Sequence, residues 1–335
     1  MADTKVSLAT AIPLPHLDDV TSWVDTGATT KYKIPADILG GFLFHGVPQF
    51  RLSLESGVPN STTDQLAKGT LYYTPCTPSG QVLSSGFLRT YNGTTARLQE
   101  SAEVSLALTL TSGKNYDVFI KNSDLSLVLS TAWTTDIARA DALTSVKDLE
   151  VANADNTFLW IGTIRAVGTN QTEDSGGLAG TTQVGARRYV WNTYNQLIRP
   201  MRAVDKTDSW TYGSTTIRQA QGNARNGCEV VMGVAGGILD ASLIVTALAA
   251  TGVNTPAIGI GFNDTAAFSG VNGQLTPVLA ADSMYGPLTA RFSGPARLGY
   301  NALSWNEVSI TGTSTFLGDN AAAFIQSGMN GFSVC

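Results

Sequence analysis

Apolar side chains recur at every second position in short segments of this chain, which is the pattern of half-buried β-strands. In residues 50–55 every second side chain is apolar, and Gly57 and Pro59 follow as turn residues. The same strand-like pattern recurs in residues 71–75, 104–110, 116–120, 125–129, 158–164, 230–234, 242–246, 257–261, 289–292, 304–310 and 314–317. We therefore expect a mainly β protein of short antiparallel strands joined by tight turns.

The composition favours the same fold class. Charged residues make up 14% of the 335 residues, whereas about 25% is typical of globular proteins. The surface helix formers Glu, Lys and Arg are therefore scarce, and 34 glycines supply turns instead. A hydrophobic content of 43% is sufficient for a sizeable core, and a chain of this length corresponds to about two domains.

We expect two antiparallel β-sandwich-like domains, one short helix and an extended N-terminal anchor. Residues 1–47 are too short to bury a core and are predicted to dock on a partner. Residues 48–222 form the first β-rich module, which includes a basic and aromatic strand followed by a linker. Residues 223–335 form the C-terminal β-sandwich module. No repeat of 20–50 residues occurs, which disfavours a β-helix or a propeller.

Two local features are predicted inside the first module. Asn92-Gly93 is the best hairpin turn in the chain, because both residues tolerate the positive φ of a type I′ turn. Between Trp133 and Leu149 the apolar spacing is helical, so we expect the short helix there, with Asp136 as its N-cap. The apolar positions of this predicted helix are Ile137, Ala140, Leu143 and Val146.

The charge balance and the cysteines limit the partners and the compartment. A net charge of -5 argues against coating of nucleic acid and against binding to an anionic membrane, because both need basic patches. The one segment that could be mistaken for a membrane span, residues 230–250, has Asp240 at its centre, so we expect no membrane insertion. Cys76, Cys228 and Cys335 form no disulfide framework, and the N-terminus lacks a secretory signal pattern. Synthesis in a reducing cytoplasm is expected.

Residues suited to catalysis are sparse. His16 and His45 are the only histidines, and no His, Cys or carboxylate group has the spacing of a zinc site. Glu173 and Asp174 are an adjacent carboxylate pair, and a glycosidase needs two carboxyl groups. Neighbours on a strand, however, point to opposite faces. We expect no enzymatic activity, no cofactor and no metal.

A basic and aromatic run between residues 187 and 225 is the candidate binding surface. Basic residues interleaved with rings are found in sites for sugars or single-stranded nucleic acid, but also in strands that pack against neighbouring subunits. We favour the subunit contact. A strand here places Tyr189 and Trp191 toward the core, and Arg188, Val190 and Asn192 toward a neighbour. The candidate interface residues are Arg187, Arg188, Tyr189, Trp191, Asn192, Tyr194 and Asn195.

Several residue runs together resemble a module of tailed-bacteriophage and prophage proteins described as virion structural, head-fibre or tail-fibre proteins. The resemblance covers residues 49–335 and departs from the pattern at Cys76, which follows Thr74-Pro75. The runs that carry it are Phe50–Leu54, Leu71–Pro75, Tyr91–Thr94, Leu110–Phe119, Ala132–Thr134, Arg139–Leu143, Leu159–Arg165, Gln171–Ser175, Arg187–Asn195, Gly259–Thr265, Leu298–Glu307, Gly318–Asn320 and Ser327–Gly331.

The resemblance implies a non-enzymatic component of a phage virion, made in the cytoplasm of the bacterial host. The leading expectation is a homotrimeric tail fibre or attachment protein. Its N-terminal segment is expected to dock on other virion proteins, and its C-terminal module is expected to reach a host surface glycan or protein. One alternative is a capsid decoration or head-fibre protein that stabilises the head. Another is a carbohydrate-degrading tailspike.

Overall fold

The computed structural model describes residues 22–24, 32–34, 48–177, 185–249, 254–274, 284–321 and 325–335. Within these residues the chain is almost entirely β-strand, with a single 3-10 turn, η2 (Ala220–Gly222), and no α-helix. The prediction of a mainly β, sandwich-like fold is confirmed. In the predicted anchor only β1 (Ser22–Val24) and β2 (Tyr32–Ile34) are described, as an antiparallel pair. The rest of that segment, with both histidines, lies outside the described residues.

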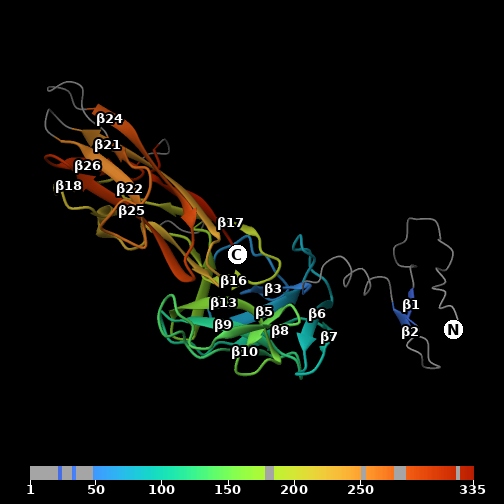
Figure 1. Ribbon diagram of the computed structural model, residues 1–335. Coiled ribbons are helices and arrows are strands. Elements are labelled where there is room, and N and C mark those ends of the chain that lie inside the picture. Colours follow the sequence, from blue (N-terminus) through green and yellow to red (C-terminus); the bar gives the residue numbers. More distant parts are fainter. Residues whose placement is uncertain are drawn as a thin grey trace, which may run out of the picture.

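The first lobe is the lower one in Figure 1. Its outer layer combines a three-stranded sheet, β3 (Phe50–Ser53), β5 (Thr70–Pro75) and β8 (Val104–Ala107), with a hairpin, β6 (Gly86–Tyr91) and β7 (Ala96–Ser101). The inner layer consists of β9 (Asn115–Lys121), β10 (Leu127–Leu129), β11 (Leu143–Val146), β12 (Leu149–Ala152), β13 (Phe158–Gly168) and β16 (Val190–Asn192). Apolar residues of both layers form one core, in which Phe50, Tyr73, Ile120 and Leu159 are buried.

The second lobe is a sandwich of two sheets, and its core continues through Trp160 and Trp191 into the first lobe. One sheet contains β20 (Gly227–Met232), β25 (Gly299–Ser309), β22 (Pro256–Phe262), β23 (Gly273–Gln274) and the short β19 (Arg218–Gln219). The other contains β17 (Ile198–Val204), β27 (Gly328–Val334), β21 (Ile238–Ala249), β24 (Met284–Pro295), β26 (Ser314–Leu317) and β18 (Ser209–Tyr212). Trp305, Leu243 and Phe316 lie buried between them.

One hydrogen-bonded sheet continues from the first lobe into the second. β13 pairs with β14 (Gln171–Ser175), which also pairs with β4 (Gln65–Lys68) and with β15 (Arg187–Arg188). The two residues of β15 then run parallel to β20 of the second lobe. The boundary predicted at residue 222 falls after β17, β18 and β19, although these three strands pair with C-terminal strands. Strand pairing therefore changes lobes between residues 192 and 198.

The predicted helix between Trp133 and Leu149 is wrong, because the segment forms a turn and the β11–β12 hairpin. Ile137 is 46% exposed, so the residues at helical spacing do not share a buried stripe. Leu143 and Val146 instead lie on a strand, whose turn places Lys147 at a φ of +54°. Asp136 does not cap a helix, and its carboxylate pairs with Arg165 at 2.7 Å.

The predicted hairpin at Asn92-Gly93 is confirmed, but its turn differs from type I′. The loop joins β6 to β7 after the Tyr91–Ala96 pair, and of its two predicted turn residues only Gly93 has a positive φ, +91°. Asn92 stabilises the loop through its side chain, whose Oδ1 accepts hydrogen bonds from the backbone N–H groups of Thr94 and Thr95. Asn92 therefore acts in this turn as a side-chain hydrogen-bond acceptor, as in an Asx-turn.

Candidate functional site at the joint between the lobes

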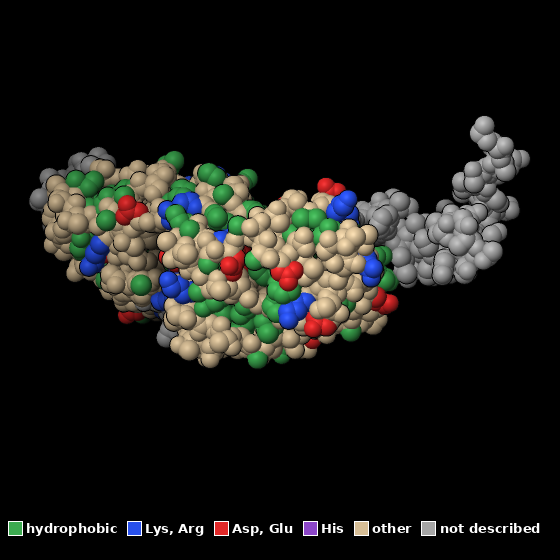
Figure 2. All heavy atoms as spheres, turned by 60° about the horizontal axis from the view of Figure 1, so that its bottom comes forward, with side chains coloured by type: hydrophobic (Ala, Val, Ile, Leu, Met, Phe, Trp, Pro, Cys, Tyr) green, Lys and Arg blue, Asp and Glu red, His purple; other side chains and the backbone are tan. Residues whose placement is uncertain are grey.

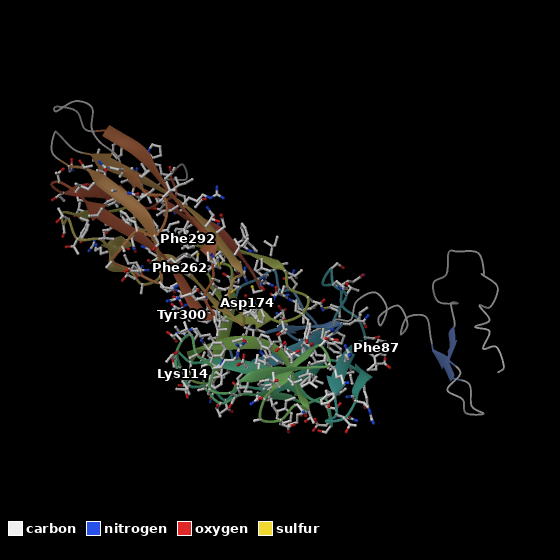
Figure 3. All side chains as sticks on the ribbon, in the orientation of Figure 1. Phe87, Lys114, Asp174, Phe262, Phe292 and Tyr300 are labelled. Carbon is white, nitrogen blue, oxygen red and sulfur yellow. The ribbon has the colours of Figure 1, made fainter. Side chains whose placement is uncertain are left out.

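The predicted basic and aromatic run lies where the two lobes meet, and it bonds to both of them. In Figure 3 the labelled Asp174 and Tyr300 mark this joint, away from Phe87 of the first lobe. Four carboxylates define the charged part of the joint: Asp117 of β9, Glu173 and Asp174 of β14, and Glu229 of β20. Each is held by at least one arginine.

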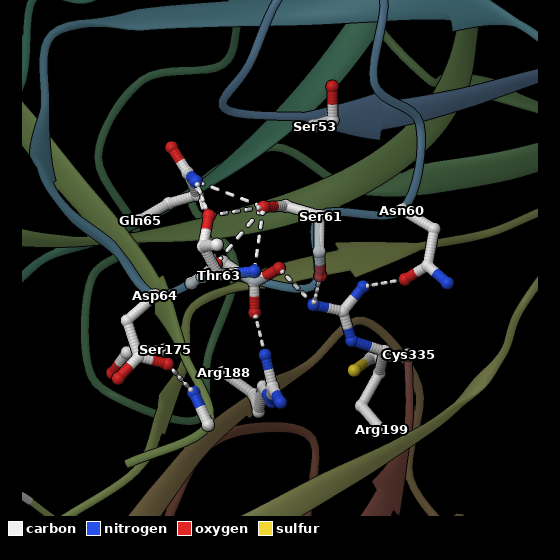
Figure 4. Close-up of polar contacts among 12 residues, drawn as sticks. Ser53, Asn60, Ser61, Thr63, Asp64, Gln65, Ser175, Arg188, Arg199 and Cys335 are labelled. Atoms are coloured by element: carbon white, nitrogen blue, oxygen red, sulfur yellow. Dashed lines mark hydrogen bonds and ion pairs between the residues drawn. The ribbon is translucent and has the colours of Figure 1, made fainter. Parts of the chain in front are cut away.

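Two arginines from neighbouring strands, Arg188 and Arg199, which are labelled in Figure 4, bind the carboxylate of Asp174. Arg188 donates to Asp174 Oδ1 at 2.9 Å, and Arg199 of β17 donates to its Oδ2 at 2.9 Å. Arg188 also donates to the carbonyl of Pro200 at 2.6 Å, and Arg199 donates to Asn60 Oδ1. With 4% of its surface exposed, Arg188 is an internal cross-link rather than a free surface cation.

Glu173 and Glu229 form a second cluster around Arg187, on the opposite face of the strand from Asp174. The Arg187 guanidinium lies 3.6 Å from Glu173 and 3.4 Å from Glu229. Tyr189 donates its hydroxyl to Glu229, and Ser175 donates to Glu173 at 2.6 Å. Burial raises the pKa of the Glu229 carboxyl above its ordinary value, and the positive charge of Arg187 opposes that rise. A proton is therefore held more readily here than on a free glutamate.

Trp191 forms the apolar centre of the joint. Its ring stacks on Trp160 of β13 with centroids 5.4 Å apart, and it is 2% exposed. Gly233, just after β20, lies against both rings: a Cβ atom at that position would come within 2.3 Å of Trp191 and 2.8 Å of Trp160. The prediction that Trp191 and Tyr189 face the core agrees with their burial. Only a glycine lets the second lobe approach the rings so closely.

The end of the run is fastened to β3, at the start of the first lobe. Asn192 accepts a hydrogen bond from the Leu52 N–H at 2.6 Å, and Asn195 donates to the carbonyls of Pro48 and Phe50 at 2.7 and 3.0 Å. Tyr194 packs against the first-lobe core, and burial raises its pKa to about 12. These side-chain amides therefore bond to the backbone of β3 in place of backbone pairing between strands. They fix the point where the chain leaves the first lobe.

Asp117 is a buried carboxylate of the joint that is not among the candidate residues predicted from the sequence. Trp133 and Trp160 donate their indole N–H groups to this carboxylate at 2.9 and 3.0 Å, and Thr163 donates at 2.7 Å. Arg139 pairs with it at 2.8 Å, lies over both indoles and donates to the carbonyl of Gly233 at 2.5 Å. Burial raises the pKa of the Asp117 carboxyl, and Arg139 opposes this rise.

Glu307 anchors a similar network inside the second lobe. It accepts hydrogen bonds from the Trp210 indole at 2.6 Å, from Arg218 at 2.9 Å and from the backbone of Gln221 at 3.0 Å. Burial raises its pKa as well. Asp117, Glu229 and Glu307 share one sequence signal: each is a single carboxylate inside a strand with apolar residues. If such a carboxylate is buried, it needs a partner for its charge.

The structure corrects the predicted orientation of the candidate strand. Arg188, Val190 and Asn192 were expected to face a neighbouring subunit, but all three are buried within the chain. The reason is that Val190 packs in the first-lobe core and Asn192 bonds to Leu52 of β3, while Arg188 is enclosed by Asp174 and the Pro200 carbonyl. Glu173 and Asp174 point to opposite faces, where different arginines neutralise them. That pair therefore does not form the two-carboxylate arrangement of a glycosidase.

The carboxylates of the joint are bound by arginine, indole and hydroxyl groups. Among the described residues no group of three or more His, Cys, Asp or Glu is placed to hold a metal. Within the same residues no helix is long and apolar enough to cross a membrane. The segment at residues 230–250 that resembled a span contributes the end of β20 and the strand β21 instead.

Comparison with known proteins assigns no family. No family model matches the chain, and no curated protein matches its sequence. A Bacillus thuringiensis Cry1Da tryptic core variant aligns over 84% of this chain and 53% of its own, at 6% identity and a TM-score of 0.21. The chain therefore spans about half the length of that protein. The infectious bursal disease virus Gx strain structure aligns over 83% and 80%, at 13% identity and a TM-score of 0.13. Similarities this low indicate neither a shared fold nor a function.

Proposed function

We propose that this protein is a non-enzymatic structural component of a bacteriophage virion, namely a homotrimeric tail fibre or attachment protein. Residues 1–47 dock on other virion proteins, and the second lobe points outward toward a glycan or protein of the host surface. One observation carries the proposal. The runs that resemble phage fibre proteins, notably Leu110–Phe119 and Arg187–Asn195, supply the Asp117, Asp174 and Trp191 contacts of the joint.

The joint suits a part that must keep a fixed shape. Ion pairs of Asp174 with Arg199 and of Arg187 with Glu229, the hydrogen bond from Arg139 to the Gly233 carbonyl and a shared sheet connect the lobes at several points. Because the carboxylates are bound by arginine and indole donors, their charge contributes to cohesion between lobes rather than to a reactive centre. On the face drawn in Figure 2, charged side chains are sparse among neutral polar atoms. Such a surface suits packing in an assembly.

Gold-labelled antibodies against the purified chain provide the test, applied to particles of the phage that encodes it. We expect label on a tail projection, and we expect excess purified protein to reduce adsorption of particles to host cells. Label confined to the head lattice would favour the capsid decoration or head-fibre alternative. Particles without any label would overturn the proposal.

The tailspike alternative has its own test. Purified protein is incubated with host surface polysaccharide, and released reducing sugar is measured for the wild type and for Glu173→Gln. We expect no release by either protein, because Glu173 is held by Arg187 and Ser175. Release by the wild type that is lost in the variant would establish a degrading enzyme instead.

A further inference from the structure

The second lobe carries one broad sheet face that the described residues leave largely uncovered. It consists of the even-numbered residues of β17, β27 and β21 and the odd-numbered residues of β24, which we call the outer face. The pairing register places these positions side by side, as in the row Arg202, Asn330, Ser242 and Arg291. The alternate positions of β21 point into the core and are buried.

The outer face gathers large exposed apolar side chains. Ile198 is 70% exposed and Ile244 is 51% exposed, and Ile238 and Tyr285 are exposed in the same way. Soluble monomers rarely leave so many large apolar side chains exposed on one sheet face. An exposed apolar patch of this kind therefore marks an interaction site. At one end the face opens into an apolar pocket of about 290 Å³, and its lining includes Trp191, Met232, Val234, Ile238, Phe332 and Val334.

Charge on the outer face is limited and largely neutralised. Its charged residues are Arg202, Asp240 and Arg291, and Arg291 pairs with Asp240 at 3.0 Å. Arg202 donates to the carbonyl of Gly177. A nucleic acid or a strongly acidic partner requires several free cations, which this face does not offer. A neighbouring copy of this chain, by contrast, can pack on so weakly charged a face without appreciable repulsion between like charges, in a two-fold or in a three-fold arrangement.

The dimensions of the outer face also match those of a protein interface. Its four strands have 7, 7, 12 and 12 residues. At ~4.8 Å between strands and ~3.4 Å per residue they span roughly 600 Å² in projection. A side-chain surface has more accessible area than its projection, and a stable interface needs about 800 Å² from each partner.

Face packing is favoured over addition of strands at the edge. Val271 already forms both backbone hydrogen bonds with Arg291 on β24, at 2.8 Å each. Pro287 and Pro295 on the same strand lack the N–H that a further strand would need. The small residues Ser242, Thr289 and Ser293 allow two sheets to approach to the usual spacing of ~10 Å.

From these observations we propose that the outer face is the surface by which this chain packs on a second copy of itself. The apolar pocket then receives an apolar side chain from the neighbouring copy. The inference rests on the homo-oligomer in the proposed function and assigns that contact to defined residues. It differs from the sequence expectation, which placed the contact on the Arg187–Asn195 strand, now shown to be internal.

The test measures the mass of the full chain by light scattering at micromolar concentration. We expect the wild type at a multiple of 35.2 kDa, and Ile244→Arg at the monomer mass. Val82→Arg is the matched control, because Val82 is 50% exposed but lies in the first lobe. It should keep the wild-type mass. Thr289→Arg, opposite Ile244 in the pairing register, should dissociate the assembly independently of any effect of Ile244 on folding.

Thermal melting of each variant separates dissociation from unfolding. A monomeric wild type would overturn this inference and the proposed homo-oligomer together. An oligomeric wild type whose mass is unchanged by both Ile244→Arg and Thr289→Arg would overturn only the outer face. Equal dissociation by Val82→Arg would also contradict it. The particle-labelling experiment is independent of all these results, so failure of the virion proposal remains distinguishable.

Discussion

Two long strands, β13 of the first lobe and β21 of the second, have similar lengths but opposite surroundings. In β13 the residues from Leu159 to Ile164 are buried on both faces, because one side meets the first-lobe core and the other meets the joint. In β21 only alternate residues are buried, and Ser242 and Ile244 face outward. Burial on both faces marks the place where the lobes meet, and burial on one face marks a surface still available for packing.

The two strands also differ in what their polar neighbours require. Thr163 on β13 is fully buried and donates to Asp117, which in turn binds two indoles and Arg139. Ser242 on β21 faces solvent and needs no such partner. Polar residues near the joint are therefore costly to replace, while those on the outer face are not.

The largest effect is expected from Trp191→Ala at the joint. Removal of this buried ring leaves a cavity beside Trp160 and should reduce the free energy of unfolding by about 3–5 kcal/mol. Ile244→Ala on the exposed face should change it by less than about 1 kcal/mol. Chemical denaturation under conditions where the wild type is monomeric measures both. Equal losses would show that the joint and the outer face do not differ in burial.

Arg188→Ala comes next, with an expected loss of about 3 kcal/mol, because it breaks a buried ion pair. From the sequence this variant was expected to weaken assembly and spare the monomer fold. The bonds to Asp174 and Pro200 reverse that expectation. Arg291→Ala is a suitable control, since its ion pair with Asp240 is exposed. A monomer of Arg188→Ala that melts like the wild type would contradict the assignment of Arg188 to the interior.

Gly233→Ala tests how closely the lobes approach. The added methyl group meets both stacked indoles, and overpacking of this kind costs about 1–3 kcal/mol. Gly69→Ala is the control, because its nearest neighbour would be the Asn170 carbonyl at 3.5 Å. We expect a lower melting temperature only for Gly233→Ala. Unchanged melting of that variant would mean that the indoles can move aside.

The smallest effect concerns pH. Burial raises the pKa of Glu229, so the folded state binds its proton more tightly than the unfolded chain does. The stability from this proton is complete below the unfolded pKa near 4.5 and is lost as the pH rises through the folded pKa. Between pH 5 and pH 8 the melting temperature of the wild type should therefore fall more than that of Glu229→Gln. A smaller fall in the wild type would contradict the raised pKa.

The fold class was predictable from the sequence because period-two alternation is a local property. The runs predicted at residues 50–55, 116–120 and 304–310 overlap the strands β3, β9 and β25. The helix at 133–149 was wrong because apolar spacing over so short a segment does not reveal which strand will pair with it. The candidate residues from Arg187 to Asn195 lie at the joint, but their neighbours there were not predictable.

The contacts of the joint could not be predicted from the sequence, for a physical reason. Whether Arg188 is exposed depends on where β17 and β20 lie, and these strands come from elsewhere in the chain. The isolated carboxylates Asp117, Glu229 and Glu307 were a usable signal, because each interrupts an apolar strand and must find a partner if buried. The partners, however, come from distant positions, such as Arg139 for Asp117 and Arg218 for Glu307.

The hydrogen bonds that close the joint span nearly the whole chain, and this determines the order of folding. Arg51 donates to the carbonyl of Cys335, 284 residues away, and β17 pairs with β27 near the C-terminal end. During synthesis the ribosome therefore releases β3 and β17 long before their partners exist. Contacts this distant in sequence form slowly and leave apolar strands exposed in the meantime. Chaperone protection of the nascent chain, and completion of the fold only once β27 has been synthesised, are the expected consequences.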